Sequence, residues 1–408
     1  MAEIFTISHL AARGDGVALT PEGPLYVPFS APGDEVRRDG EAVSVVRHGP
    51  NRQTPACPHF GPCGGCALQH VDDRSYRAWL ADRVRVALAQ QNVEAASIEA
   101  AEISPSGGRR RCAWQARWHQ GHLHLGYSGR ASHDTVDLTA CPVLEPQLLA
   151  LAGPLRELFA RHLPRRRAGR VQLLASETGV DLLIEGLEAD RPEMMQDLSK
   201  IFQTRDLARI SLLSDGHAEI ALMARAPVLT IGRATVRPAP GAFVQPTKAG
   251  EQSLQQALRD GLAGCRRIAD LFAGLGSFSL VAAEWASVHA VEGQRAALAA
   301  LEAARGGGHG LKPITTAHRD LFRRPLTTQE LASFDAVIVD PPRAGALAQV
   351  ANLAATRVGQ LMMISCNPNT FARDARLLVD GGYNLAWVRP VGQFLWSREV
   401  ELAALFVR

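Results

Sequence analysis

Cysteine is scarce in this chain, whose 408 residues include 7 cysteines at uneven spacings. Such a number excludes the disulfide framework that holds small secreted domains together. The segment from Met1 to Leu10 lacks the charged and then apolar pattern of a secretory signal. No apolar run approaches the roughly 18 to 20 residues of a membrane-spanning helix. These absences predict a protein of the reducing cytoplasm with no role in a membrane.

Net charge is also low, at +3 for the whole chain at pH 7. A global positive field therefore cannot drive binding to a polyanion, and any affinity for nucleic acid must come from local clusters. The candidates are the arginines at 109–111, beside Trp114 and Trp118, and those at 165–167. Arginine suits phosphate groups and stacked bases better than lysine does. The alternative to nucleic-acid binding is that the arginines are abundant only because of the base composition of the genome.

The length of the chain predicts two to three domains with ample core. Residues 1–53 contain short apolar runs separated by glycine and proline turns, which is the pattern of a small β-barrel. Residues 54–237 hold the clustered cysteines and a mixed α/β pattern, with an amphipathic helix predicted from Tyr76 to Gln91. A joint at Pro238–Gly241 precedes residues 238–408, whose apolar strands predict an open α/β sheet.

A glycine turn follows the first predicted strand of this third region. Gly274 and Gly276 stand between that strand and a helix start, where they let the backbone approach a ligand closely. Ser279 occupies the place of the third glycine of the dinucleotide fingerprint, which argues against a nicotinamide or flavin. The next strand ends in Glu292, about 20 residues on, where a carboxylate can bind ribose hydroxyls. The pattern favours a nucleoside cofactor over a plain turn with a solvated glutamate.

Two more predicted strands end in residues that can do chemistry. Asp340 is followed by two prolines, which make a rigid loop and fix the carboxylate at the rim of the sheet. The apolar run at 362–365 ends in Cys366. Because reactive groups collect past the carboxyl ends of strands in open α/β sheets, we expect both residues to line one cleft. Taken alone, a single cysteine after a strand is more often a small core residue, and Asp-Pro-Pro can be a simple turn.

Four other cysteines form a possible metal site. Three follow a C-x5-C-x2-C spacing and the fourth lies in a distant Cys-Pro pair; they are Cys57, Cys63, Cys66 and Cys141. Glycines between the first three let a loop wrap its thiolates around a compact charge, which suits a [4Fe-4S] cluster and a zinc ion equally. Cys112 and Cys265 are interpreted as small buried thiols.

The motifs of residues 238–408 resemble those of the RNA uracil-C5 methyltransferase family, within the class I S-adenosylmethionine-dependent methyltransferases. Four motifs in chain order carry the resemblance, at residues 270–278, 340–345, 365–374 and 393–401. With the N-terminal features, it covers nearly the whole chain. It implies an α/β fold with a Rossmann-like class I methyltransferase domain, an N-terminal OB-like TRAM β-barrel and a central α/β iron-sulfur region.

The resemblance also implies a mechanism. Carbon 5 of uracil is a poor nucleophile, so a thiolate, here Cys366, first adds to carbon 6. Glu401 matches the carboxylate that later removes the carbon-5 proton so that the thiol can be eliminated. The residues that the resemblance assigns to S-adenosylmethionine are Gln245, Phe272, Gly274, Gly276, Glu292, Asp320 and Asp340.

The chain departs from the family pattern in several places. In the loop before Glu401, three residues replace a proline and two histidines; they are Leu395, Trp396 and Glu399. Gly392 stands where an aspartate is common, and Thr247 stands where the family has an asparagine. Residues 303–308 replace an Asn-Ala-x-x-Asn stretch on the adenine side. We expect the base and the nucleophile to be retained within a loop of different geometry.

Cluster-bearing members of the family share the cysteine pattern, followed by Gln69–His70, so the resemblance favours a structural [4Fe-4S] cluster over zinc. The barrel resembles a TRAM domain, which implies RNA binding. Members with both features act on 23S ribosomal RNA, so we expect that substrate and a monomeric enzyme. Three alternatives remain: a tRNA uracil-C5 methyltransferase, a non-catalytic RNA-binding protein and a metal-dependent redox protein.

Overall fold

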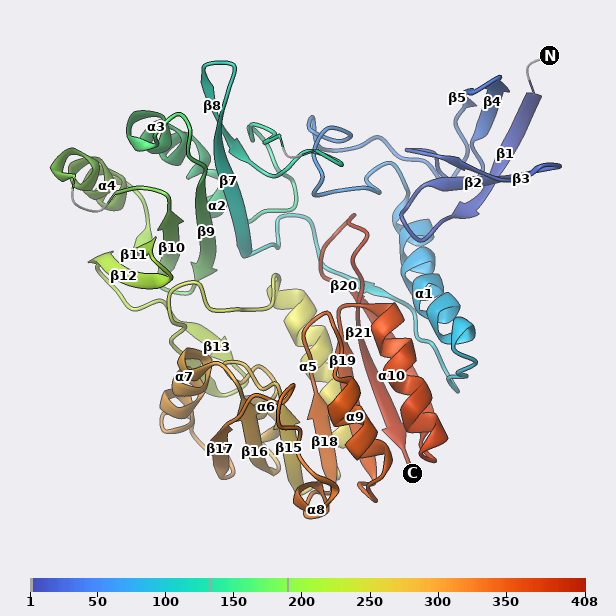
Figure 1. Ribbon diagram of the computed structural model, residues 1–408, viewed down its shortest axis with the longest axis vertical. Coiled ribbons are helices and arrows are strands. Elements are labelled where there is room, and N and C mark those ends of the chain that lie inside the picture. Colours follow the sequence, from blue (N-terminus) through green and yellow to red (C-terminus); the bar gives the residue numbers. More distant parts are fainter. Residues whose placement is uncertain (1–2, 133, 189–190) are drawn as a thin grey trace.

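The computed structural model describes residues 3–132, 134–188 and 191–408 (Figure 1). Its first sheet consists of five short antiparallel strands in the order β3-β2-β1-β4-β5. The strands are β1 (Glu3–Leu10), β2 (Gly16–Thr20), β3 (Gly23–Val27), β4 (Glu35–Asp39) and β5 (Ala42–Arg47). Buried side chains such as Ile7 and Val36 form a small separate core. This sheet is consistent with the predicted barrel, and its identification as a TRAM domain stays a prediction.

The middle of the chain forms a six-stranded sheet in the order β12-β11-β10-β9-β7-β8. Its strands are β7 (Arg111–His119), β8 (His122–Gly126), β9 (Gly169–Ser176), β10 (Gly179–Glu185), β11 (Leu207–Ser214) and β12 (His217–Met223). The helices of this part are α2 (Pro146–Leu149), α3 (Ala152–His162) and α4 (Pro192–Thr204). A short hairpin of β13 (Leu229–Ile231) and β14 (Ala234–Val236) leads into the C-terminal region.

The C-terminal region forms an eight-stranded sheet in the order β17-β16-β15-β18-β19-β21-β20-β6. Its strands are β6 (Glu102–Ile103), β15 (Arg267–Leu271), β16 (Ser287–Glu292), β17 (Ile314–His318), β18 (Ala336–Val339), β19 (Gln360–Ser365), β20 (Asn384–Gly392) and β21 (Glu401–Val407). The helices are α5 (Lys248–Leu262), α6 (Ser279–Ala282), α7 (Arg295–Arg305), α8 (Thr328–Leu331), α9 (Leu347–Ala354) and α10 (Pro368–Asp380). The strands from β15 to β19 are parallel, as predicted, and β21 runs antiparallel to β19 and β20.

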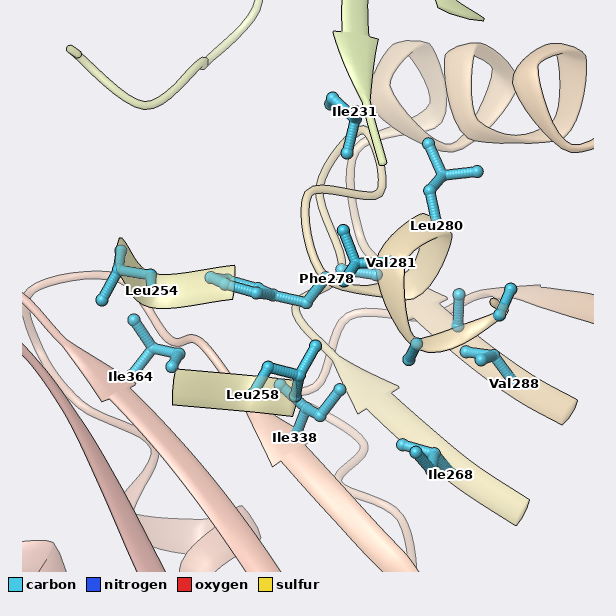
Figure 2. Packing of buried hydrophobic residues seen from close by; sticks show 14 of the residues in the cluster. Ile231, Leu254, Leu258, Ile268, Phe278, Leu280, Val281, Val288, Ile338 and Ile364 are labelled. Atoms are coloured by element: carbon cyan, nitrogen blue, oxygen red, sulfur yellow. The ribbon is translucent and has the colours of Figure 1, made fainter. Parts of the chain in front are cut away.

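Helices cover both faces of this sheet. Alternation along β18 sends Ile338 to one face, where it packs with Leu254 and Leu258 of α5 (Figure 2). Its neighbours Val337 and Val339 point to the opposite face, which α9 and α10 cover. Burial on both faces explains why these strands are continuous apolar runs in the sequence.

The helix predicted from Tyr76 to Gln91 is α1 (Asp73–Gln90), which begins three residues earlier than predicted. The earlier start has a local cause, because Asp72 caps the helix by accepting a hydrogen bond from the Ser75 amide at 2.9 Å. Its buried side chains Val84 and Leu88 belong to the core beneath α10. β6 also pairs with β20 at the edge of the C-terminal sheet. Elements from residues 54–237 thus complete the C-terminal layer, and the domain limits at 53 and 237 stay predictions. Among the described residues, no helix is long and apolar enough to cross a membrane.

We predict that Leu258→Ala lowers the free energy of unfolding by about 2–5 kcal/mol, because Leu258 is fully buried between α5 and the sheet. Leu347→Ala is the matched control in a helix, since Leu347 is 50% exposed and its loss leaves no cavity. Urea unfolding followed by circular dichroism gives the two midpoints. Equal midpoints for the two variants would contradict the packing described here.

Candidate active site

The turn after β15 has the backbone that its glycines predict. Gly274 and Gly276 have φ angles of 57° and 97°, in the left-handed region that favours glycine. A Cβ atom on Gly276 would lie 2.5 Å from Leu301, whereas one on Gly274 would meet nothing within 4 Å. Phe272, with φ of 64°, is also left-handed, a strain typical of functional sites. The turn therefore packs tightly on α7 at Gly276 and leaves open space beside Gly274.

Glu292, at the end of β16, is tied to this turn. Its Oε2 atom accepts a hydrogen bond from the Gly274 amide at 2.8 Å, and its Oε1 atom accepts one from the Gln294 amide at 2.6 Å. Asp320 follows β17, is half exposed, and accepts a hydrogen bond from the Phe322 amide at 3.0 Å. The Phe322 ring lies 5.4 Å from the ring of Phe272. The predicted cofactor residues of three strand ends thus line one edge of the sheet.

Hydrogen bonds join the loop that carries Asp340 to the loop that carries Cys366. The carbonyl of Arg343 accepts hydrogen bonds from the side chains of Asn367 at 3.4 Å and Thr370 at 3.3 Å. The buried carboxylate of Asp374 accepts a further bond from the Ala346 amide at 3.0 Å. The motifs at 340–345 and 365–374 are therefore two halves of one structure.

Sheet register brings Glu401 next to Cys366. β21 is antiparallel to β19, and Ser365 is paired with Leu402. Cys366 follows Ser365 and Glu401 precedes Leu402, so both residues lie at the same end of neighbouring strands. The sequence placed the two residues in one site by resemblance, and this register supplies the geometric reason.

Burial and mutual repulsion change the acidity of these groups. Burial raises the pKa of Cys366 to about 11, and the charges of Glu401 and Asp340 add to the effect. Burial raises the pKa of Glu401 to about 7, in the range that suits a general base near neutral pH. Burial and the Glu401 charge also raise the pKa of Asp340 well above its usual value. The three groups therefore act electrostatically as one site.

The segment around Gln245 packs against the same site. Gln245 is buried, and its side-chain oxygen accepts a hydrogen bond from the Gln393 amide nitrogen at 2.9 Å. Thr247 caps α5 by accepting a hydrogen bond from the Gly250 amide at 3.0 Å. Asparagine is also a favourable helix cap, so threonine can fill this capping role. Gln393 begins the loop that ends at Glu401, so Gln245 contacts the start of the loop that carries the candidate base.

The four candidate metal ligands line a single cavity, and they are Cys57, Cys63, Cys66 and Cys141. Arg109 and Gln393 line the same cavity. Burial raises the pKa of Cys66 to about 12, so the thiol is protonated at neutral pH. Within residues 3–132, 134–188 and 191–408, no three cysteine, histidine or acidic side chains are grouped closely enough to hold a metal ion. The thiols thus share one cavity without forming a closed ligand set.

Sequence reasoning assigned no role to Tyr76, although its hydroxyl lies 3.4 Å from the carbonyl of Phe394 in the loop before Glu401. These two residues are 318 positions apart. The local pattern around Tyr76 indicates only an apolar helix face, so no signal in the sequence could have revealed this contact.

Comparison with known proteins agrees with this geometry. A family model described as tRNA (uracil-5-)-methyltransferase matches residues 232–406. An uncharacterized RNA methyltransferase of Rhizobium meliloti is 40% identical over 98% of this chain and 98% of its own. A 23S rRNA (uracil(1939)-C(5))-methyltransferase, RlmD, of Pectobacterium atrosepticum is 33% identical over 98% of this chain and 93% of its own.

A solved structure shares the fold over the whole length. It is the tRNA (uracil-54, C5)-methyltransferase of Pyrococcus abyssi in complex with S-adenosyl-L-homocysteine, with a TM-score of 0.74, 20% identity, and coverage of 99% of this chain and 100% of that chain. The predicted class I methyltransferase fold is therefore confirmed. With the identity of its full-length relatives, this shows that the chain belongs to the RNA uracil-C5 methyltransferase family.

Proposed function

We propose that this protein methylates carbon 5 of a uridine in 23S ribosomal RNA, with S-adenosylmethionine as methyl donor and a covalent cysteine adduct as intermediate. The observation that carries the proposal is the register that sets Glu401 beside Cys366 at the carboxyl edge of the sheet. A nucleophile and a base with a raised pKa at one strand end are what this chemistry requires.

Each residue has a definite task in this scheme. The Cys366 sulfur adds to carbon 6 of the uracil ring, and the electron pair of the 5,6 double bond moves toward the carbonyl oxygen on carbon 4 to give an enolate. Carbon 5 of that enolate then takes the methyl group of S-adenosylmethionine, whose methyl–sulfur bond breaks to leave S-adenosylhomocysteine. Glu401 removes the proton that remains on carbon 5, the double bond re-forms, and the carbon-sulfur bond breaks to release Cys366.

Acidic residues at the strand ends suit a cationic methyl donor. Asp270, Glu292 and Asp340 all lie at or beside the carboxyl edge, and their charges act on one another. A sulfonium ion would relieve this repulsion. Gly274 offers open backbone, and Glu292 stands where ribose hydroxyls can bind. We assign the remaining donor contacts to Gln245, Phe272, Gly276 and Asp320.

We further propose that Cys57, Cys63, Cys66 and Cys141 hold a structural [4Fe-4S] cluster. Their common cavity supports this assignment, since it joins the loop of the first three thiols to the segment that carries Cys141. Burial raises the pKa of Cys63 and of Cys141, and the positive charge of Arg109 opposes this rise. A bound cluster would supply a fixed link between the two segments of chain.

Ribosomal RNA is preferred because a relative named for 23S rRNA aligns with nearly the whole chain. The second candidate is tRNA, since the matching family model and the structural neighbour are both named for tRNA. Both substrates present a uridine that must leave its stack to reach the half-buried thiol of Cys366.

Substitution of the base tests the covalent mechanism. Glu401→Gln should still permit addition and methyl transfer but not proton removal, so a covalent protein-RNA species should persist on a denaturing gel. Cys366→Ala should form no such species and should retain affinity for S-adenosylmethionine, because the donor residues are unchanged. Full turnover by Cys366→Ala would contradict the covalent mechanism.

The pH dependence of the same step can be measured on the native enzyme. Because the pKa of Glu401 is raised to about 7, most of this carboxyl group is protonated below that pH and cannot accept the carbon-5 proton. Resolution of the adduct should therefore accelerate as pH rises through about 7. A resolution rate that falls over this range would exclude Glu401 as the base.

Metal content tests the cluster. Protein purified without oxygen should be brown, contain iron and sulfide, and lose colour when any one of Cys57, Cys63, Cys66 or Cys141 is replaced by serine. Cys112→Ser is the matched control, since Cys112 is buried in the core of the central sheet. A colourless protein with one equivalent of zinc would contradict the cluster and indicate a structural zinc ion instead.

Competition between substrates tests the choice of RNA. The full-length protein should methylate unmodified 23S rRNA in preference to unmodified tRNA when both are present at equal concentration. Mass mapping of the nucleosides identifies the modified uridine in each. Preferential methylation of tRNA would overturn the ribosomal assignment and leave the chemistry intact.

A further inference from the structure

The loop of residues 393–400 joins β20 to β21 and ends at Glu401, and its backbone is held by residues from the N-terminal half of the chain. The carbonyl of Trp396 accepts hydrogen bonds from the amides of Ala67 at 2.8 Å and Leu68 at 3.0 Å. These amides directly follow Cys66. The cysteine-bearing segment and the loop before the candidate base are therefore joined by backbone hydrogen bonds.

Tyr76 makes the second attachment. Its side chain is fully buried, and its hydroxyl lies 3.4 Å from the carbonyl of Phe394 and 3.3 Å from that of Ser397. These distances are long for single O–H···O bonds, so the hydroxyl lies between two acceptors and its hydrogen is shared. Burial raises the pKa of Tyr76, which keeps the hydroxyl protonated as a donor.

Arg83 extends the attachment along α1. Its guanidinium donates a hydrogen bond to the carbonyl of Arg398 at 3.3 Å. Arg83 lies seven residues after Tyr76, about two helical turns, so both side chains project from the same face of α1. Groups on α1 and on residues 67–68 thus bind consecutive carbonyls from Trp396 to Arg398, along with that of Phe394.

Apolar packing explains why this chain needs such a support. Leu395 and Trp396, which replace the proline and one histidine of the family pattern, are buried in a cluster with Tyr76 and Leu68. The N-terminal sheet contributes Leu10 to that cluster. Trp396 has a φ angle of 57°, a conformation that L residues seldom adopt without external support. The loop is therefore held by the neighbouring elements rather than by its own sequence.

We propose that Tyr76 is a positioning residue for the methyl-transfer reaction, which holds the 393–400 loop so that Glu401 faces carbon 5 of the uracil ring. This inference rests on the proposed role of Glu401 as the base. The amides of Ala67 and Leu68 donate hydrogen bonds to the same loop. A displacement of the cysteine-bearing segment would therefore also displace the loop that carries Glu401. Cys366 directly follows β19 and lies outside the 393–400 loop.

A specific kinetic consequence follows. Loss of the support displaces Glu401 but leaves the thiol and the donor-binding turn in place. Addition and methyl transfer then proceed, while proton removal slows by roughly ten- to a hundredfold, the effect of a misplacement near 1 Å. The covalent protein-RNA species therefore accumulates. General destabilisation would instead reduce the amount of active enzyme without trapping an adduct.

The test compares Tyr76→Phe with Tyr383→Phe. Tyr383 is equally buried, and its hydroxyl donates a hydrogen bond to the carbonyl of Val358 at 2.7 Å, away from the loop. Tyr76→Phe should accumulate adduct, with unchanged affinity for S-adenosylmethionine and faster amide hydrogen exchange in residues 394–400. Tyr383→Phe should do neither. If Tyr76→Phe fails to fold, Arg83→Met, at a half-buried position, should likewise trap adduct and speed amide exchange in the loop.

Glu401→Gln serves as the reference in the same experiment. If it traps no adduct, the proposed function fails, and hydrogen exchange in the loop still reports on the support. If it traps adduct and Tyr76→Phe does not, or if Tyr383→Phe traps as much as Tyr76→Phe, the positioning role of Tyr76 is overturned.

Discussion

Parallel pairing of β15, β16, β18 and β19 is the constraint on which the candidate site depends. Each of these strands ends at the same edge of the sheet, so residues that directly follow them must meet there. The glycine turn, Glu292, Asp340 and Cys366 come from four strands and share this edge. These side chains meet because the hydrogen bonds between the parallel strands place the strand ends side by side.

The reversed strand β21 adds what parallel pairing cannot supply. A strand that runs against its neighbours begins at the edge where they end, so its first residue, Glu401, enters the site. The cost is a connection from β20 that must turn within the site itself. In this protein that connection is apolar and partly strained, and α1 and the cysteine-bearing segment hold it in place. The N-terminal half thereby contacts the loop that precedes Glu401.

Burial gives the site its chemical character. Burial raises the pKa values of Asp340 and Glu401, and the charge of Glu401 adds to the rise at Asp340. The same negative charges make the Cys366 thiol a weaker acid in the absence of ligands. A cationic donor bound at this edge would favour ionisation of both the thiol and the carboxyl groups. Binding of the methyl donor would then lower the pKa of the Cys366 thiol and so activate the nucleophile.

The sequence by itself determined the features that depend on neighbouring residues. Left-handed glycines at 274 and 276, the rigid turn after Asp340, the helix that became α1 and the thiol after a buried strand all follow from short patterns. Resemblance to a family added Glu401, which no local pattern would have singled out. The N-terminal strands and turns also followed from local spacing.

Only the tertiary structure decided which distant segments meet. β6 completes the C-terminal sheet, Cys141 joins the cavity of three earlier cysteines, and Tyr76 reaches a loop 318 positions away. Leu395 and Trp396 were departures without explanation in the sequence, and in the fold they fill a core that the N-terminal half supplies. The physical reason is that contacts between remote elements produce no repeating pattern in the sequence of either segment. Turns and strands, in contrast, depend on the conformational preferences of neighbouring residues.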